Sequence, residues 1–325
     1  MRLLIAGAGA IGGFLAAQFA AAGHDVAVVA RGRQLEAIRS DGLRLVTAAG
    51  PDIVASVDTY GTLEDAGSSD AIIVTVKAYQ LQALAPMLAG AAMHTRMFVP
   101  VQNGIGWWYF HGLIGKHAQR RIHAVDPTGQ LSAAIPARLI VPMFAFKAAE
   151  VIAPGVIRHI PSETDQFPLG ELDGAETPRL RDLADALSKA GLKAPIADVR
   201  AIMWTKLLGN IYANPICALT QVALGPVVTH PSTRKLALRV MQECASVAEA
   251  FGVEIPISFE QRLARSAAIG AARPSMLQDR EAGRQMELDA ILASLVELGG
   301  LEGIPTPCVQ SLLACLQLVD VPTMH

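Results

Sequence analysis

Cysteine is scarce in this chain, and charged residues are less frequent than in most soluble proteins. The four cysteines are Cys217, Cys244, Cys308 and Cys315, and they form no CxxC pair and have no histidine nearby at a metal-binding spacing. A disulfide framework and a metal site are therefore not expected. The cysteine usage predicts reduced, mostly buried thiols in a cytoplasmic protein.

An excess of positive charge is also missing. The chain has 27 lysines and arginines against 29 acidic residues, a formal net charge of -2, which argues against a nucleic-acid or membrane-surface partner. Hydrophobic residues make up 52% and charged residues 17%, so large cores are possible and little disorder is expected. A length of 325 residues predicts two domains.

Charged side chains are absent from the N-terminal run between Leu3 and Gly23, a pattern shared with signal peptides and membrane spans. Four glycines and Gln18 interrupt this run, and Arg2 is the only basic residue before it. We interpret the run as a short buried strand, a glycine turn and an apolar helix.

The first part of the chain alternates apolar strand-like runs with helical sequence. These runs are 2–6, 25–30, 71–76 and 97–101. The alternation predicts a mainly parallel, doubly wound sheet. Residues 43–57 predict a hairpin around a Gly-Pro-Asp turn, and the run 139–146 and the Pro154-Gly155 turn predict antiparallel edge strands that extend the sheet.

Beyond Asp198 the sequence favours long helices. The expected helical stretches are 199–223, 232–251, 275–298 and 307–318, and Pro215 should kink or interrupt the first. The predicted organisation is an α/β domain over residues 1–198, followed by an all-α domain over residues 199–325, with the substrate between them.

A glycine motif follows the first predicted strand and opens the first helix. Gly7-Ala8-Gly9-Ala10-Ile11-Gly12 has the pattern GxGxxG, which allows a tight turn, a close approach to a pyrophosphate and close helix–strand packing. The alternative, that the glycines only pack an apolar helix, is less favoured because strands flank the motif on both sides. Gly7, Gly9, Ala10, Ile11 and Gly12 are thus predicted to bind a dinucleotide in a Rossmann-like domain.

The residue after the second strand indicates which dinucleotide is bound. Enzymes that use NAD usually have an acidic residue there, whereas this chain has Ala30 followed by Arg31, Gly32 and Arg33. A guanidinium suits a 2′-phosphate, so Arg31 predicts NADP(H), although it could also be a solvated loop charge.

Lys206, Asn210 and Asn214 are spaced to form one polar stripe on an otherwise apolar helix. Such a stripe is either a solvent-exposed face or the lining of a pocket, and the scarcity of charges around it favours the pocket. A second candidate set contains Ser275, which could also cap a helix, and Glu287, expected some three turns further along the same helix. Between them, residues 279–284 are expected to form a solvated face.

Taken together, these motifs resemble the ketopantoate reductase family over nearly the whole chain. The resemblance lies in GAGAIGG with Arg31, in Val76-Lys77-Ala78, in Gln102-Asn103-Gly104, in the Trp204–Pro215 helix, in Ser275–Asp279 with Glu287-Leu288-Asp289, and in Gly303–Pro307.

The resemblance implies roles for individual residues. Lys206 would be the general acid in the reduction of ketopantoate to pantoate by NADPH, within pantothenate and coenzyme A synthesis. Glu287 would bind the resulting hydroxyl and orient Lys206. The remaining implied residues are Asn210, Asn214 and Ser275 for the substrate, Lys77 for the cofactor, and Asn103 for both.

Two features depart from the family pattern. The segment Trp107–Ile135 is longer and more aromatic than expected, which favours a packed loop, a dimer contact or an altered cleft, and Met286 stands where the family usually has threonine. The alternatives are therefore a reductase of the same family acting on another 2-oxo acid and a non-catalytic NADPH-binding sensor. A homodimer is a further expectation.

Overall fold

The computed structural model describes residues 1–48 and 50–320, which form two compact units. Residues 49 and 321–325, which belong to the predicted hairpin and the predicted helical domain, lie outside the described residues. Unit 1 consists of Met1–Gln102, Phe110–Arg121 and Thr128–Val199, and unit 2 of Asn103–Tyr109, Ile122–Pro127 and the residues from Arg200 onward. The main division is thus one residue from the predicted limit, but two short upstream segments of unit 2 were not predicted.

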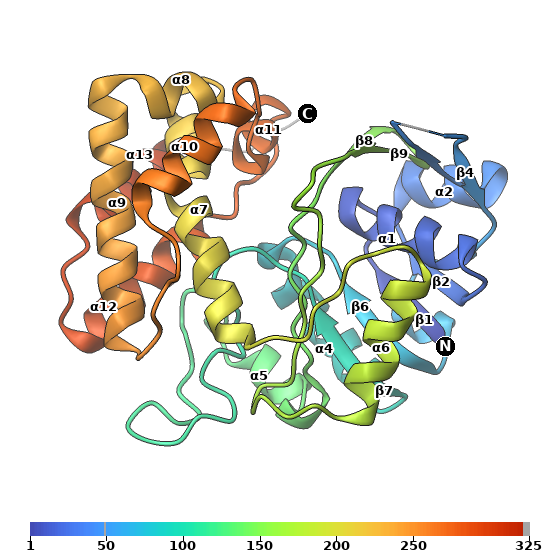
Figure 1. Cartoon of the computed structure of the whole chain (residues 1–325). Coiled ribbons are helices and arrows are strands. Elements are labelled where there is room, and N and C mark those ends of the chain that lie inside the picture. The colour runs from blue at the N-terminus through green and yellow to red at the C-terminus, as the bar shows by residue number, and fades with distance from the viewer. Residues whose placement is uncertain (49, 321–325) are drawn as a thin grey trace. The chain divides into compact units, whose positions relative to one another are not determined.

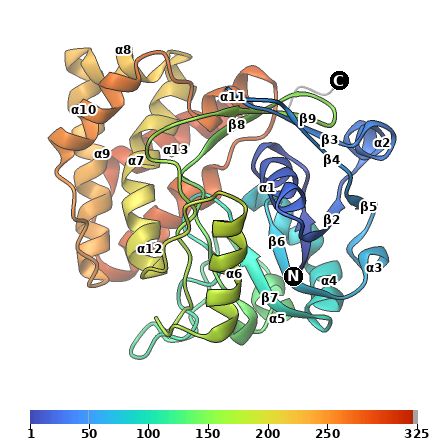
Figure 2. The ribbon, with the colours of Figure 1, turned by 45° about the vertical axis from the view of Figure 1, so that its right-hand side comes forward.

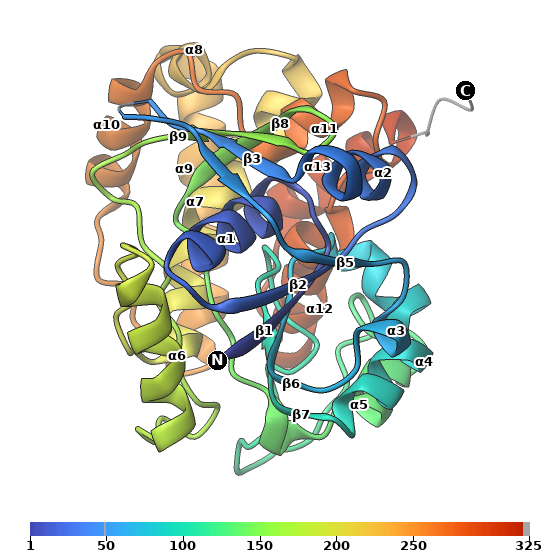
Figure 3. The same cartoon turned by 90° about the vertical axis from the view of Figure 1, so that its right-hand side faces the viewer.

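Unit 1 contains a five-stranded parallel sheet in the order β5-β2-β1-β6-β7; Figure 1 labels its strands except β5, and Figure 3 labels all five. Its strands are β1 (Arg2–Ala6), β2 (Asp25–Val29), β5 (Asp58–Tyr60), β6 (Ser69–Val74) and β7 (Thr95–Pro100). The apolar runs of β1, β2, β6 and β7 are buried, as expected of a parallel sheet covered by helices. Because the strand order reverses between β1 and β6, the carboxyl ends of these strands form the topological switch point where such sheets bind ligands.

Helix α1 (Ala10–Ala21) lies between this sheet and a second one (Figures 2 and 3). The second sheet has the order β4-β3-β9-β8 and contains β3 (Leu43–Val46), β4 (Ile53–Ala55), β8 (Ala148–Ala153) and β9 (Val156–Ile160). The predicted hairpin is present, with Leu43 opposite Ala55. The strands around the Pro154-Gly155 turn, β8 and β9, do not extend the first sheet as expected, because β9 pairs with β3 instead. Since α1 is apolar on nearly every side, it needs a cover on both faces.

The run 139–146 does not form a regular strand. It lies parallel to β7, with a bridge between Ile140 and Phe98 and hydrogen bonds from the Val141 and Met143 N–H groups to the β7 carbonyls, so it extends the sheet in the parallel and not the predicted antiparallel sense. Its antiparallel bridges are made to Gln166 and Leu169. Pro142 lies inside the run, and it cannot donate a hydrogen bond to a strand ladder.

The remaining helices of unit 1 cover the sheets. They are α2 (Gly32–Asp41), α3 (Leu63–Ala66), η1 (Ala78–Gln80), α4 (Leu81–Ala92), α5 (Gln130–Ala134), η2 (Ala137–Leu139) and α6 (Pro178–Lys189). Leucines of α6 share one hydrophobic core with α1 and with one face of the parallel sheet. The predicted fold class of this part is thereby confirmed.

Unit 2 is helical, as predicted. Its elements are α7 (Val199–Thr220), α8 (Leu224–Thr229), α9 (Pro231–Ala250), α10 (Phe259–Ile269), α11 (Ser275–Glu281), the π-helical turn η3 (Asp289–Ala293), α12 (Ser294–Glu302) and α13 (Pro307–Val319). Of the two expected effects of Pro215, a kink or an interruption, the interruption does not occur, since α7 continues through this residue between buried Ile211 and Ile216. Within the described residues, no helix is both long and apolar enough to span a membrane.

The predicted helix over residues 275–298 is broken, so Glu287 does not lie on the helix that Ser275 begins. Gly283 has a φ of 62°, its N–H bonds to the Arg280 carbonyl, and the Arg284 N–H bonds to the Asp279 carbonyl. This pattern is a Schellman motif, which ends α11 at a glycine in the left-handed conformation. The chain then runs without regular structure to Glu287, just before η3.

The aromatic residues of Trp107–Ile135 belong to the interior. Trp107, Trp108 and Tyr109 are 2%, 3% and 1% exposed. Within unit 2, the Trp204 Nε1–H donates to the Tyr109 hydroxyl over 3.0 Å, and the Phe251 and Tyr109 rings lie at 86° to each other with centroids 5.9 Å apart. The interpretation as packed residues is therefore correct, and these tryptophans do not offer an exposed contact surface.

Replacement of Gly283 by alanine should destabilise the protein by about 1–2 kcal/mol, because a Cβ disfavours the left-handed conformation. Gly90→Ala is the matched control: Gly90 lies inside α4 and nothing is within 4 Å of a Cβ added to it, so alanine should stabilise the protein by about 0.5–1 kcal/mol. Urea unfolding of both variants measures the two changes. Equal changes of the same sign would contradict the assigned end of α11.

Candidate functional site

The glycine motif occupies the turn between β1 and α1 in unit 1. Gly7 has a φ of 112°, and a Cβ there would lie 2.8 Å from Val76 Cγ1. A Cβ on Gly12 would lie 1.9 Å from the Gly7 carbonyl oxygen, which also accepts a hydrogen bond of 2.6 Å from Thr75 Oγ1. The first and third glycines are therefore required by the close packing of this turn against the end of β6.

Gly9 has a different environment. It is the N-cap of α1, its position is exposed, no side chain caps the helix there, and nothing lies within 4 Å of a Cβ built on it. The next residues, Ala10 and Ile11, are in the first turn of the helix, whose N–H groups have no partner within the helix. An uncapped helix N-terminus beside open space at the switch point suits a pyrophosphate.

Arg31 lies at the carboxyl end of β2, where it is exposed and forms the N-cap of α2. Gln34, one turn into α2, donates to the Ala8 carbonyl over 2.7 Å and accepts from the Gly155 N–H over 3.0 Å. Sequence reasoning missed this tether between α2 and the glycine turn. The residues present fit a dinucleotide, and the guanidinium of Arg31 can bind a 2′-phosphate.

Lys77 follows β6 at the same edge of the sheet. It is half-buried, and its backbone N–H donates to Gln80 Oε1 over 3.1 Å. The Gln102 side chain, from the end of β7, donates to the carbonyls of Val74 and Val76 over 2.8 and 3.0 Å. These bonds fix the loops that follow β6 and β7.

In unit 2, the three residues of the polar stripe belong to α7, the helix labelled in Figure 1. Lys206 and Asn210 are half-buried and Asn214 is 3% exposed, so the stripe is not a solvent-exposed face. Asn214 Oδ1 accepts hydrogen bonds from Ser275 Oγ and from the Met276 N–H over 3.3 and 3.2 Å. Asn214 therefore caps α11, and Ser275, the first residue of that helix, does not act as its cap.

The predicted solvated face over residues 279–284 is only partly exposed. Asp279 is 3% exposed and accepts from Arg284 Nε over 3.0 Å. Arg280 donates to the carbonyls of Ala218 and Leu219 at the end of α7. The expectation fails for Asp279 and Arg280 because α11 packs this face against the end of α7.

Three of the predicted residues come together in unit 2. Glu287 is 4% exposed, and Asn103 Nδ2 donates to its Oε2 over 3.4 Å. Burial lowers the pKa of Lys206 to about 8, and the negative charge of Glu287 partly offsets this effect. A half-buried ammonium with a pKa close to neutrality, beside a carboxylate and an amide, can donate a proton to a substrate oxygen.

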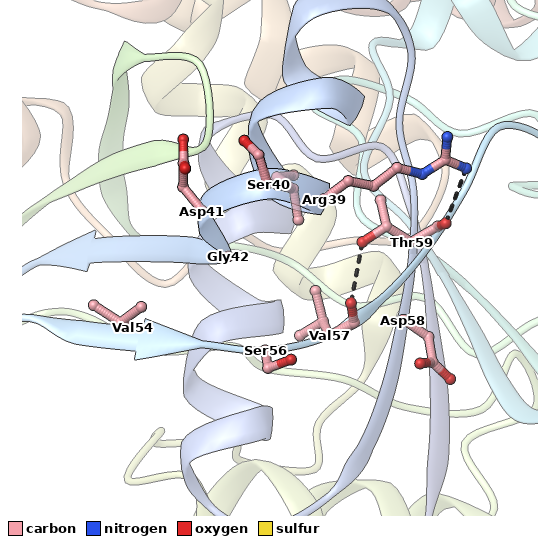
Figure 4. Close-up of a pocket in the computed structure, with 10 residues that line it drawn as sticks. Arg39, Ser40, Asp41, Gly42, Val54, Ser56, Val57, Asp58 and Thr59 are labelled. Carbon is pink, nitrogen blue, oxygen red and sulfur yellow. Dashed lines mark hydrogen bonds between the residues drawn. The ribbon is translucent and has the colours of Figure 1, made fainter.

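A cavity of about 480 Å³ lies elsewhere in unit 1, between the C-terminal end of α2 and residues 54–59 (Figure 4). Arg39 donates to the Thr59 carbonyl at its edge over 3.2 Å. None of the predicted site residues lines it. In residues 1–48 and 50–320 no cluster of His, Cys, Asp and Glu side chains is suited to a metal ion.

Two family models match the chain: "Ketopantoate reductase PanE/ApbA" over residues 3–108 and "Ketopantoate reductase PanE/ApbA C terminal" over residues 198–320. The chain belongs to the ketopantoate reductase family. A 2-dehydropantoate 2-reductase from Mesorhizobium japonicum is 41% identical, with coverage of 99% of this chain and 98% of that protein. The relative from Archaeoglobus fulgidus, with the same name, is 30% identical over 98% of both chains.

Solved structures agree with the family. A 2-dehydropantoate 2-reductase from Geobacter metallireducens superposes with a TM-score of 0.83 at 27% identity, over 98% of this chain and 99% of that chain. D-mandelate dehydrogenase, solved with NADH and anilino(oxo)acetate, has a TM-score of 0.83 at 22% identity, over 98% of both chains. At that identity the second likeness concerns the fold alone.

Gly9→Ala and Gly12→Ala should separate cofactor binding from folding. Because open space surrounds Gly9, its alanine variant should keep the wild-type melting temperature but bind NADPH at least about tenfold more weakly, through a methyl group that obstructs the phosphates. Gly12→Ala should lower both the melting temperature and the affinity for NADPH, since its Cβ would collide with Gly7. Fluorescence titration with NADPH and thermal unfolding measure these effects. Wild-type NADPH affinity in Gly9→Ala would exclude the α1 N-terminus as the phosphate site.

Proposed function

We propose that this chain is an NADPH-dependent 2-dehydropantoate 2-reductase, which reduces ketopantoate to pantoate at the C2 carbonyl. The observation that carries this proposal is the set formed in unit 2 by Lys206, Glu287 and Asn103. Family membership supports the reaction type, and the relatives named above carry this activity in their names. In domain terms, residues 1–198 would bind the cofactor and residues 199–325 would supply the helical catalytic domain.

The protein must protonate the substrate's carbonyl oxygen as negative charge develops on it. Bound NADPH would supply the hydride to C2, which leaves negative charge on the former carbonyl oxygen. Lys206 would donate a proton to that oxygen, because its lowered pKa makes the ammonium a stronger acid than an exposed lysine. Glu287 would accept a hydrogen bond from the new hydroxyl, and its charge would keep Lys206 protonated near neutral pH.

The remaining polar residues would hold the substrate and the cofactor. Asn210 on α7 and Ser275 on α11 would bind the substrate, with Ser275 near its carboxylate, and Asn214 would hold Ser275 in place through their hydrogen bond. Gly7, Gly9, Ala10, Ile11 and Gly12 would bind the pyrophosphate. Lys77 and Asn103 would lie on the nicotinamide side, and Arg31 would bind the 2′-phosphate.

A different 2-oxo acid is the second candidate substrate. Met286 and Leu288 flank Glu287 in the sequence and are 2% and 5% exposed, so a buried apolar side chain, Met286, stands where the family usually has a threonine. This setting favours the alternative of a branched or aromatic side chain on the substrate.

We further propose a cytoplasmic location, consistent with four free cysteines, and a homodimer, for which the exposed Leu318 of α13 is a candidate contact.

Spectroscopic assay of NADPH oxidation with ketopantoate and a panel of other 2-oxo acids, with NADH as the alternative cofactor, tests the function. The fastest turnover is expected with NADPH and ketopantoate.

Arg31→Ala should raise the KM for NADPH about 10- to 100-fold and leave the KM for NADH unchanged, because a charge-assisted contact to the 2′-phosphate is lost. Arg39→Ala, at the other end of α2, is the control. Equal use of NADH and NADPH by the wild type would refute the assignment of Arg31.

Lys206→Ala should lower kcat about 10²- to 10⁴-fold through loss of the general acid. Lys235→Ala, at an exposed lysine of α9, should leave kcat unchanged. In the wild type, reduction requires protonated Lys206, so kcat should be constant below pH about 8 and fall above it, whereas oxidation of pantoate should rise over the same range. Steady-state pH profiles in both directions measure this. A descending limb that persists in Lys206→Ala would assign the proton to another group.

A further inference from the structure

The π-helical turn η3 begins two residues after Glu287 and changes which groups bond to one carbonyl. In an α-helix the Ser294 N–H would bond to the Ala290 carbonyl, but here it bonds to the Asp289 carbonyl. The Ala290 oxygen is thereby released from its helical partner. It accepts instead from the Ser294 hydroxyl over 2.7 Å and from the Ile105 N–H over 2.8 Å.

The segment that carries Asn103 is attached to the turn at this oxygen. Ile105, whose N–H makes the bond, is two residues from Asn103 and is 1% exposed. Between them, Gly104 has a φ of 80°, and a Cβ on it would lie 2.0 Å from the Ala290 oxygen. Only glycine allows this approach, so the backbone around Asn103 is fixed by the same carbonyl that the π turn releases.

The other end of the turn fixes Glu287. The Ile291 N–H bonds to the Glu287 carbonyl over 3.3 Å, so the carboxylate residue is held by the first turn of the same helix. The Ser294 side chain is fully buried, and its hydroxyl donates a hydrogen bond to the Ala290 carbonyl oxygen of the same helix. One irregular turn therefore sets the backbone positions of both Glu287 and Asn103.

We propose that η3 and the Ser294 hydroxyl form a positioning device that holds Asn103 against Glu287, and that Ser294 is a positioning residue for the reaction. The effect of Ser294 on turnover rests on the proposed function, whereas its effect on the positions of Asn103 and Glu287 does not. A hydroxyl that bonds to the carbonyl four residues earlier is common for serine in helices. What distinguishes Ser294 is that its acceptor also binds the segment of Asn103.

The readout is the titration of Lys206. The charge of Glu287 raises the Lys206 pKa against the effect of burial. If Ser294→Ala lets Glu287 move away, the Lys206 pKa should fall by about half a unit, less than the one unit or more expected for complete loss of the charge in Glu287→Gln. The pKa is measured in the cofactor-free protein from the pH dependence of acetylation of Lys206, followed by mass spectrometry.

The same variant should show its effect in turnover. Ser294→Ala should lower kcat several-fold, move the descending limb of the kcat profile to lower pH and leave the KM for NADPH unchanged. Gly104→Ala, which displaces the segment without touching Ser294, should shift the Lys206 titration in the same direction. Ser311→Ala is the matched control, because Ser311 makes the same kind of 2.7 Å bond to a helical carbonyl on α13 and should change neither quantity.

The outcomes separate the inference from the proposed function. A wild-type Lys206 titration in both Ser294→Ala and Gly104→Ala would overturn the positioning role, even in an active reductase. A lowered Lys206 pKa in both variants would support it, even if the protein reduced no 2-oxo acid in the panel.

Discussion

The electrostatic interaction between Glu287 and Lys206 constrains how unit 2 is built. A carboxylate that is 4% exposed costs several kcal/mol to bury unless an opposite charge and hydrogen-bond donors compensate it. Lys206 supplies the charge from α7, and Asn103 supplies a donor from a segment far upstream. The end of α11 at Gly283, the irregular stretch after it and the π turn together bring the carboxylate to this position. Regular helix from Ser275 onward would place it elsewhere.

Unit 1 depends on a different constraint, the close approach of backbones around α1. The glycine turn has room for no side chain at two of its three glycines, while the third faces open space. Gly7 and Gly12 pack against the residues that follow β6, whereas Gly9 lies at the start of α1, at the switch point where such sheets bind ligands. The Gln34 side chain then joins the start of α2, with Arg31, to the same turn. Rigid packing on one side and open space on the other are what a phosphate site requires.

The sequence predicts best where structure is decided locally. GxGxxG between a strand and a helix, and the spacing of Lys206, Asn210 and Asn214, depend on neighbouring residues, and both features are present where they were expected. The position of Glu287 could not be predicted, because the helical sequence pattern continues across Gly283 although helix α11 ends before it. Likewise, β8 and β9 have ordinary strand sequences, and only the need to cover α1 assigns them to a separate sheet. Asp279 looked solvated because its neighbours are charged, but packing against the end of α7 buries it.

The hydrogen bond between Trp204 and Tyr109 links residues 95 positions apart, and those that the His123 and Ala124 N–H groups donate to the Glu297 carboxylate link residues more than 170 apart. Unit 2 is therefore not a contiguous piece of chain, and a fragment that starts at Arg200 lacks part of its own interior. During synthesis, the segments Asn103–Tyr109 and Ile122–Pro127 leave the ribosome well before the helices that enclose them. At about 5–20 residues per second, Tyr109 is synthesised several seconds or longer before Trp204 and Phe251, which pack against it. The segment Asn103–Tyr109 thus makes the folding of unit 2 depend on residues that are synthesised well before its helices.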